Sequence, residues 1–235
     1  MDLYRLHNNE LEPVSKTAFD LEKDIQSLVE KNLPSLFSLE FVATEFSIDE
    51  FRIDTLAFDE ENNAFVIIEY KKGSSYSVVD QGYAYLSKML EKKADFVLEY
   101  QEQTGKALKK SDVDWTQSKV VFISPAFNAY QKNSVNFRDV PFELWEIKKY
   151  GKDLISLVQH KPSSKESIEK FKATTSEITS VSSEIQVADE QDHLSKSSPE
   201  CLELWESLKE YFSAFADTGY SVKRSEERRV GKECL

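Results

Sequence analysis

Residues 51–86 read FRIDTLAFDEENNAFVIIEYKKGSSYSVVDQGYAYL. Two apolar runs in this stretch, Phe51–Asp59 and Ala64–Lys71, are rich in Val, Ile, Phe and Tyr, which are typical of strands. Residues 60–63 between them, EENN, suit a tight turn because Asn tolerates the left-handed backbone conformation. The stretch therefore predicts a β-hairpin, and the apolar spacing after residue 78 predicts a helix behind it.

Three charged side chains interrupt the apolar hairpin: Asp54, Glu69 and Lys71. Glu69 and Lys71 share one face because side chains alternate along a strand. A turn centred on residues 61–62 places Asp54 opposite Glu69, whereas a turn centred on residues 62–63 places it opposite Lys71. Directly opposed residues of an antiparallel pair point to the same side, so both registers gather the three charges on one face.

The hairpin is predicted to be covered on both faces. One face continues from the charges into Leu56 and Phe58, and the other carries Ile53, Ala57, Val66, Ile68 and Tyr70. Two carboxylates and an ammonium group are costly to bury there unless a cation or a substrate uses them. The spacing suits metal-assisted phosphodiester cleavage, because carboxylates on adjacent strands can hold Mg²⁺ and a nearby lysine can stabilise charge. The alternative interpretation of such charges is a solvated strand face or a structural network.

Asp54 followed by Glu69-x-Lys71 resembles the signature of the PD-(D/E)xK nuclease superfamily, with Ile53 at the position of the proline. Gln81-x-x-x-Tyr85 is similar to the QxxxY motif of its RecB-like branch. The segments RIDTL, VIIEYK and QGYAYL resemble NucS-like endonuclease domains, and the resemblance covers about residues 18–150. It implies an α/β fold with a restriction-endonuclease-like core, a mixed β-sheet flanked by helices.

The resemblance also implies a chemistry and a partner. Asp54 and Glu69 would hold Mg²⁺, for which Mn²⁺ can substitute, and Lys71 would position or activate the attacking water. Gln81 and Tyr85 would support that arrangement in an endonuclease-like hydrolysis of DNA. Many nucleases of this kind act as dimers, so a homodimer is one expected state.

Glu22 is the third candidate metal ligand, because the resembling families carry an acidic residue on the first helix; a glutamate on the helix surface is the equal alternative. Arg52, Lys72 and Gln81 are candidate nucleic-acid-binding residues. Arg52 can also pair with a carboxylate or reach solvent. The net charge of −12 argues against tight non-specific binding, since phosphate binding usually leaves a basic footprint.

Two other functions stay open at this stage. One is a catalytically inactive nucleic-acid-binding or regulatory module that keeps the nuclease fold. The other is an interaction protein that meets an unknown protein partner through a further C-terminal domain. The sequence leaves the substrate open between single-stranded, branched, mismatched or modified DNA and RNA.

The chain is predicted to contain four segments. Residues 1–160 form the nuclease-like domain, and residues 161–198, crowded with Ser, Thr, Lys and Glu, form a flexible linker. Residues 199–223 begin a second, truncated helical domain with one apolar stripe and a proline at the first helical position. Residues 224–235 are expected to be artefactual, because RSEERRVGKEC resembles a translated sequencing adapter.

Periodicity predicts the remaining elements of the first domain. They are a helix over 17–32, a strand over 39–47, one or two helices over 78–103, an exposed polar loop over 106–118, strands over 119–124 and 142–147, and a short helix over 127–135.

Composition limits the class of protein. No apolar run approaches the length needed to cross a membrane, and the N-terminus lacks a signal-peptide pattern. The two cysteines are far apart and the three histidines are scattered, which argues against a disulfide framework, a zinc site or a His-ligated metal. A cytoplasmic location without membrane contact is therefore the expectation.

Overall fold

The predicted hairpin lies inside the sheet on which the fold is built. Strands β5 (Phe51–Asp59) and β6 (Ala64–Tyr70) pair antiparallel, and their register centres the turn on residues 61–62. This is the register that sets Asp54 opposite Glu69 rather than opposite Lys71.

Asp59 holds the turn of this hairpin in place. Its Oδ1 accepts hydrogen bonds from the backbone N–H groups of Glu61 and Asn62, and its Oδ2 accepts one from the Asn62 side chain. Asn63 has a φ of 49°, in the left-handed region that Asn tolerates. The turn chemistry of the EENN segment therefore fixes which residues of the two strands meet.

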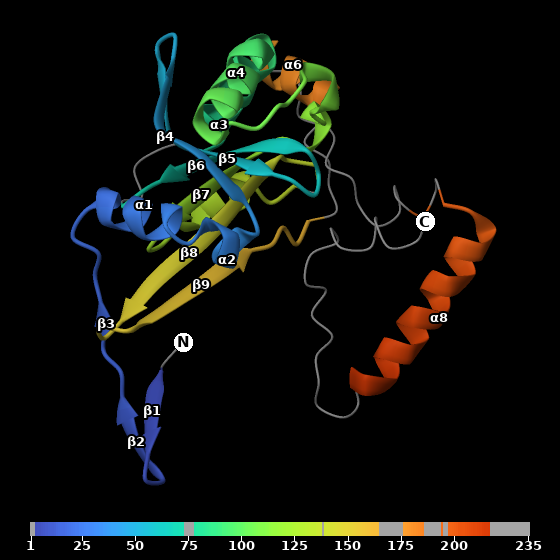
Figure 1. Ribbon diagram of the computed structural model, residues 1–235. Coiled ribbons are helices and arrows are strands. Elements are labelled where there is room, and N and C mark those ends of the chain that lie inside the picture. The colour runs from blue at the N-terminus through green and yellow to red at the C-terminus, as the bar shows by residue number, and fades with distance from the viewer. Residues whose placement is uncertain are drawn as a thin grey trace. The chain divides into compact units, whose positions relative to one another are not determined.

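The computed structural model describes residues 3–72, 78–137, 139–164, 176–185, 194 and 197–216 (Figure 1). The chain divides into two compact units, Met1–Val187 and Ala188–Leu235.

The first unit contains a mixed sheet with the strand order β3-β8-β7-β6-β5-β4, in which β9 also pairs with β8. Strands β6, β7 and β8 are parallel to one another, and the other pairs are antiparallel. The predicted α/β class with a mixed sheet is therefore confirmed. The strands beside the hairpin are β3 (Lys16–Thr17), β4 (Glu40–Ile48), β7 (Lys119–Ser124), β8 (Phe142–Tyr150) and β9 (Leu154–His160).

Helices cover both faces of this sheet (Figure 1). One face packs Ala57, Val66 and Ile68 against residues of the first two helices, as the alternation predicts. The other face packs Phe65 and Ile67 against residues of the helices that follow β6. The helices are α1 (Glu22–Glu30), α2 (Leu33–Phe37), α3 (Val78–Glu91), α4 (Lys93–Thr104) and α5 (Ala129–Ser134).

Ile53 is an exception to the predicted alternation, since it packs in the same core as Leu56, on the side of α3 and α4. The alternation along β5 therefore breaks between these two residues, at Asp54. Glu45, at the facing position of β4, has a φ of 52°, a backbone conformation that shifts the side chains beyond it to the other face. The irregularity lies at the predicted metal ligand.

Three features of the first unit differ from the predicted ones. α1 begins at Glu22 rather than at residue 17, and Phe19 is buried without being helical. The segment 106–118 is not a fully exposed loop, because Trp115 is buried and stacks on Phe65 with ring centroids 5.6 Å apart. Strand β9 was not predicted. Gly105, with a φ of 69°, is the C-cap of α4, close to the predicted end of the helices over 78–103.

A helix also lies inside the segment predicted as a flexible linker. Helix α6 (Ser176–Glu184) packs against α3, with Val181 and Ile185 buried in the core. Two apolar residues at helical spacing anchor this Ser- and Thr-rich segment, so the linker prediction is wrong for residues 176–185. The rest of the segment lies largely outside the described residues.

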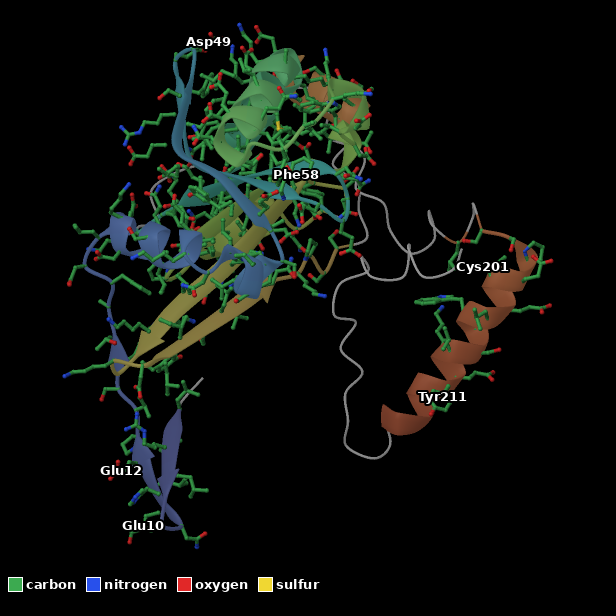
Figure 2. The ribbon with its side chains drawn as sticks, viewed as in Figure 1. Glu10, Glu12, Asp49, Phe58, Cys201 and Tyr211 are labelled. Carbon is green, nitrogen blue, oxygen red and sulfur yellow. The ribbon has the colours of Figure 1, made fainter. Side chains whose placement is uncertain are left out.

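Figure 2 shows two further elements at the ends of the chain. Strands β1 (Tyr4–His7) and β2 (Glu10–Pro13) form an exposed hairpin. In the second unit, α8 (Pro199–Ala216) begins at the predicted proline and exposes Leu202, Leu208 and Tyr211. Residues 224–235 lie outside the described part of the chain. Among the helices that the structure describes, none combines the length and apolar character that a membrane crossing requires.

Gly82→Ala tests how closely α3 packs on the sheet. A Cβ at Gly82 would lie 2.5 Å from Cε1 of Phe142 on β8, so the buried ring would have to move. We expect the free energy of unfolding to fall by about 1–3 kcal/mol, the usual cost of overpacking. Urea unfolding measures it, with Ser87→Ala on the same helix as the control. An unchanged unfolding midpoint for Gly82→Ala would contradict the packing described.

Candidate active site

Glu69 is a buried carboxylate, and only one of its two oxygens accepts hydrogen bonds from the described residues. Its side chain lies at the end of β6, and the residue is 4% exposed. Oε1 accepts hydrogen bonds from Lys71 Nζ at 2.7 Å and from Gln81 Nε2 at 2.8 Å. Oε2 is also buried, but no residue in the described ranges donates a hydrogen bond to it. Because buried polar atoms are nearly always paired, this oxygen calls for an explanation.

Asp54 lies opposite Glu69 at the irregular point of β5. Its Oδ2 accepts a hydrogen bond of 3.0 Å from the backbone N–H of Tyr70, just beyond Glu69 on β6. Its backbone carbonyl accepts a second bond, of 2.8 Å, from Gln26 Nε2 on α1. Asp54 is therefore held by the neighbouring strand β6 through its side chain and by helix α1 through its backbone.

Gln81 and Tyr85 join the carboxylates to α3. They are four residues apart on this helix, so they lie on the same side, and Gln81 Nε2 also lies 3.0 Å from the Tyr85 hydroxyl. That hydroxyl donates to the carbonyl oxygen of Arg52 at 3.1 Å. Burial raises the pKa of Tyr85, so it stays a neutral donor at ordinary pH. The QxxxY pair thus links Glu69 on β6 to the backbone of β5.

The environment of both carboxyl groups disfavours their negative charge. Burial raises the pKa of Glu69, and the charge of Asp54 raises it further, while Lys71 and Gln81 oppose the shift only in part. Burial also raises the pKa of Asp54, against the bond from Tyr70 and the charge of Lys71. A buried and a half-buried acid with raised pKa values would both be stabilised as anions by a cation between them.

The residues present fit a divalent metal ion. Asp54 and the unpaired Oε2 of Glu69 supply hard carboxylate oxygens, which Mg²⁺ prefers, and Mg²⁺ commonly uses only one or two carboxylates while keeping several waters. Within the described ranges, no group of three or more His, Cys, Asp or Glu side chains is placed to hold a metal. A metal held by Asp54 and Glu69 would therefore have two protein carboxylates as its ligands among the described residues.

Glu22 reaches the end of β6 without completing a group of three. It is the first residue of α1, and its Oε1 accepts a hydrogen bond from the backbone N–H of Lys72. The Lys72 side chain donates to the carbonyl oxygen of Asp20. Glu22 and Lys72 therefore fasten α1 to the end of β6, directly after Lys71.

Arg52 takes the second of its three predicted roles. It forms an ion pair with Glu45 on β4, which also pairs with Lys23 at 2.8 Å. The Arg52 side chain is 62% exposed, whereas Glu69 is buried. Its guanidinium charge is therefore already offset by a carboxylate.

Gln26 is the positioning residue that sequence reasoning missed. It is buried on α1 and donates to Thr44 Oγ1 at 3.0 Å and to Glu30 Oε1 at 2.9 Å as well as to Asp54 O. A signal was present, because Gln26 is a polar residue between Ile25 and Val29 on the apolar side of the predicted helix. Polar residues at such positions need partners when buried.

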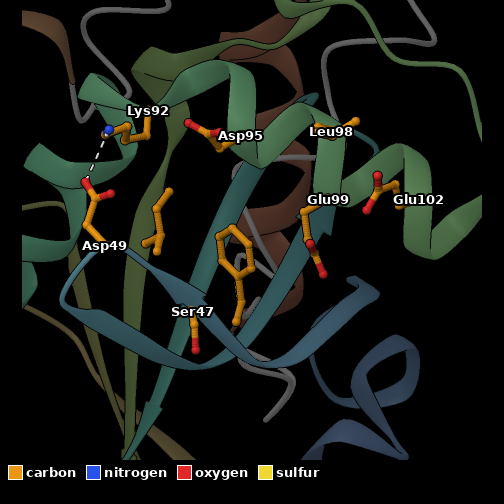
Figure 3. A pocket seen from close by; sticks show the side chains of 9 residues that line it. Ser47, Asp49, Lys92, Asp95, Leu98, Glu99 and Glu102 are labelled. Atoms are coloured by element: carbon orange, nitrogen blue, oxygen red, sulfur yellow. Dashed lines mark ion pairs between the residues drawn. The ribbon is translucent and has the colours of Figure 1, made fainter.

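An acidic hollow lies near the β4 edge of the sheet (Figure 3). It encloses about 280 Å³ between the end of β4 and α4. Four of its lining residues are acidic and one is basic, Lys92, which pairs with Asp49 at 3.2 Å. This surplus of negative charge repels phosphate. The acidic residues are Asp49, Asp95, Glu99 and Glu102.

No known protein-family profile matches the chain. Among solved structures, it is similar to a repair endonuclease from Pyrococcus abyssi, with 15% identity, 52% of this chain and 45% of that chain covered, and a TM-score of 0.28. It is also similar to the EndoMS–dsDNA2 complex, with 15% identity, 58% of this chain and 54% of that chain covered, and a TM-score of 0.30. A third similar structure is Pyrococcus furiosus SfsA in complex with Ca²⁺, with 14% identity, 55% of this chain and 60% of that chain covered, and a TM-score of 0.27. The chain spans less than two thirds of each of these proteins, and the scores are too low to bear on function.

One curated relative is much closer in sequence. It is an uncharacterized protein of Haemophilus influenzae, 46% identical over 211 residues, which are 89% of this chain and 70% of that protein. At this identity and coverage, the chain belongs to the same family as the uncharacterized Haemophilus influenzae protein.

Proposed function

We propose that this chain is a metal-dependent nuclease that hydrolyses phosphodiester bonds in DNA. The observation that carries the proposal is the buried Oε2 of Glu69, which has no hydrogen-bond partner among the described residues, on the residue that faces Asp54 across the hairpin. An unsatisfied buried acceptor costs about 1–3 kcal/mol, so a purely structural network would be expected to pair it. A cation that takes this oxygen as a ligand accounts for it.

The chain's own residues would divide the work as follows. Asp54 and Glu69 would hold Mg²⁺ or Mn²⁺, which when bound supplies a Lewis acid for water and for the scissile phosphate. The Lys71 ammonium group, 2.7 Å from Glu69 Oε1, can donate to the attacking water or to a phosphate oxygen. Water's oxygen forms the new bond to phosphorus, and one ester P–O bond breaks.

Gln81 and Tyr85 would act by positioning. Gln81 holds Oε1 of Glu69, so that Oε2 keeps its direction, and Tyr85 holds Gln81 against the backbone of β5. Correct geometry at a reacting centre is worth several kcal/mol, and a displacement of about 1 Å can cost 100-fold in rate. Glu22 is proposed to position the site, because it accepts a hydrogen bond from the backbone N–H of Lys72 at the end of β6. Lys72 is proposed to contact the phosphate backbone of the substrate.

Removal of the proposed catalytic charges should abolish cleavage. The full chain is incubated with single-stranded, duplex, forked and mismatched DNA and with RNA, in Mg²⁺ or Mn²⁺. We expect Glu69→Gln and Lys71→Ala to lower kcat at least about 100-fold, the scale of a positioned charge or acid–base group. Glu61→Gln, an exposed residue at the other end of the hairpin, is the matched control and should keep full activity.

Undiminished activity of Glu69→Gln would refute the assignment. If the wild-type chain binds nucleic acid but cleaves none of the substrates, it is the catalytically inactive module with the nuclease fold, and binding should then be insensitive to Asp54 and Glu69.

Metal should stabilise the wild-type chain but not a variant that lacks one ligand. We expect Asp54→Asn to raise the metal-free stability by on the order of 1 kcal/mol, because a like charge next to Glu69 is removed while the oxygen that accepts from Tyr70 is kept. Thermal melting with and without Mn²⁺ measures both effects. Equal stabilisation of Asp54→Asn and wild type by Mn²⁺ would show that the metal binds elsewhere.

The pH dependence follows from the raised pKa values of Asp54 and Glu69. The folded chain binds these protons more tightly than the unfolded chain, so metal-free stability falls as pH rises from about 4, the ordinary carboxyl pKa, through the raised values. Metal competes with the same protons, so Mn²⁺ affinity should increase over this range. Titrations at several pH values test this, and an affinity independent of pH would contradict it.

A further inference from the structure

A second buried carboxylate, Glu146 on β8, gathers three basic side chains. Lys148 Nζ lies 2.6 Å from Oε2, and Lys132 Nζ and His160 Nε2 lie 3.0 Å and 2.8 Å from Oε1. Glu146 is 7% exposed, whereas the three basic side chains are 28–37% exposed. These four residues, called the Glu146 cluster below, come from β8, α5 and β9.

The Glu146 cluster carries a positive surplus in a strongly acidic chain. Burial opposes ionisation of Glu146, but Lys148, Lys132 and the nearby His160 ring outweigh it and lower the pKa of Glu146 to about 2. One permanent negative charge therefore faces two lysine ammonium groups, and His160 adds a third positive charge when it is protonated. In a chain with a net charge of −12, such a local surplus is notable.

The cluster lies on the same face of the sheet as the candidate active site and near the same ends of the parallel strands. Glu69, Phe122 and Leu144 form one row across β6, β7 and β8, and Phe122 and Leu144 pack in the core on the α3 side. Two residues further on, Ser124 pairs with Glu146, and Lys71 occupies the corresponding position after β6. With strands about 4.8 Å apart, Glu146 lies roughly 10 Å across the sheet from Lys71.

A small hollow opens beside the cluster. It encloses about 160 Å³, well below the roughly 300–1,000 Å³ of pockets for drug-sized ligands, so it suits a small group. Its lining contains basic residues and hydrogen-bonding side chains and no acidic residue. The lining residues are Lys132, Asn133, Val135, Asn136, His160, Lys161, Pro162 and Ser163.

Charge sets a direction across the sheet. The acidic hollow lies at the β4 edge, Asp54 and Glu69 lie on β5 and β6, and the Glu146 cluster lies at β8, β9 and α5, on the far side of β7. A polyanion is repelled by the first region and attracted by the last. The path of lowest electrostatic energy for a nucleic-acid strand therefore runs from the active site toward β8.

We propose that the Glu146 cluster binds a backbone phosphate of the nucleic-acid strand whose scissile bond lies at Asp54, Glu69 and Lys71. This inference rests on the proposed nuclease function and extends it with a second phosphate site. Lys132 and Lys148 contact the phosphate. Glu146 is a positioning residue that holds two mutually repelling ammonium groups side by side.

The test compares binding of labelled single-stranded and duplex DNA over 50–200 mM salt, in a Glu69→Gln background that prevents cleavage. We expect Lys132→Gln with Lys148→Gln to weaken binding by on the order of tenfold and to reduce the salt slope by about 0.7–0.9 for each lost phosphate contact. Lys109→Gln, an exposed lysine in the segment that leads to the amino end of β7, should change neither quantity.

Further measurements separate binding from folding and catalysis. In the cleavage-competent background, which keeps Glu69, the variants Lys132→Gln and Lys148→Gln should raise KM and leave kcat at saturating DNA unchanged. Lys132→Gln alone, on the most exposed of the three basic side chains, tests the site if the double variant melts, and Lys132→Arg should restore affinity. A wild-type chain that cleaves DNA while the lysine variants keep its affinity and salt slope overturns this inference alone. A wild-type chain that neither binds nor cleaves overturns the proposed function with it.

Discussion

The register of one antiparallel hairpin is the constraint on which the candidate site depends. The turn at residues 61–62, held by Asp59, sets Asp54 opposite Glu69, and a slip by one residue would separate them. Helix α3 then closes over the pair, since Gly82 allows it to approach Phe142 and Gln81 reaches Glu69. The close packing of α3 on the sheet thus fixes the orientation of the Glu69 side chain, which the strand register has placed opposite Asp54.

Electrostatics gives this geometry its chemical meaning. The fold places Asp54 and Glu69 in half-buried and buried positions that raise the pKa of both carboxyl groups, and among the described residues Lys71 and Gln81 donate to one oxygen of Glu69 and none donates to the other. The negative charge of Glu69 is therefore only partly compensated at Oε2, while Lys71 pairs with Oε1. Functional sites commonly retain such a local cost because a ligand offsets it. At Glu146, in contrast, positive groups exceed the single negative charge.

Sequence patterns were sufficient where strand alternation and turn chemistry agree. They predicted β5, β6, β7 and the start of α8 closely, and they brought Asp54 and Glu69 to one face. They failed where a side chain's role depends on distant partners. The side chain of Ile53 faces α3 and α4 because the backbone is irregular at Glu45 on the neighbouring strand. Val181 anchors a helix in a polar segment, and Glu146 meets Lys132 and His160 from two other elements, α5 and β9, besides Lys148 on its own strand. Such tertiary contacts leave no local periodicity to detect.

Anomalous diffraction from crystals of the full chain soaked in Mn²⁺ is the most direct test of the central claim, that Asp54 and Glu69 form a divalent-cation site. The account predicts an anomalous peak in contact with Asp54 and with Oε2 of Glu69, with water completing the coordination. A peak only in the acidic hollow near Asp95 and Glu99, or a buried Oε2 that instead binds an ordered water with no metal nearby, would contradict it.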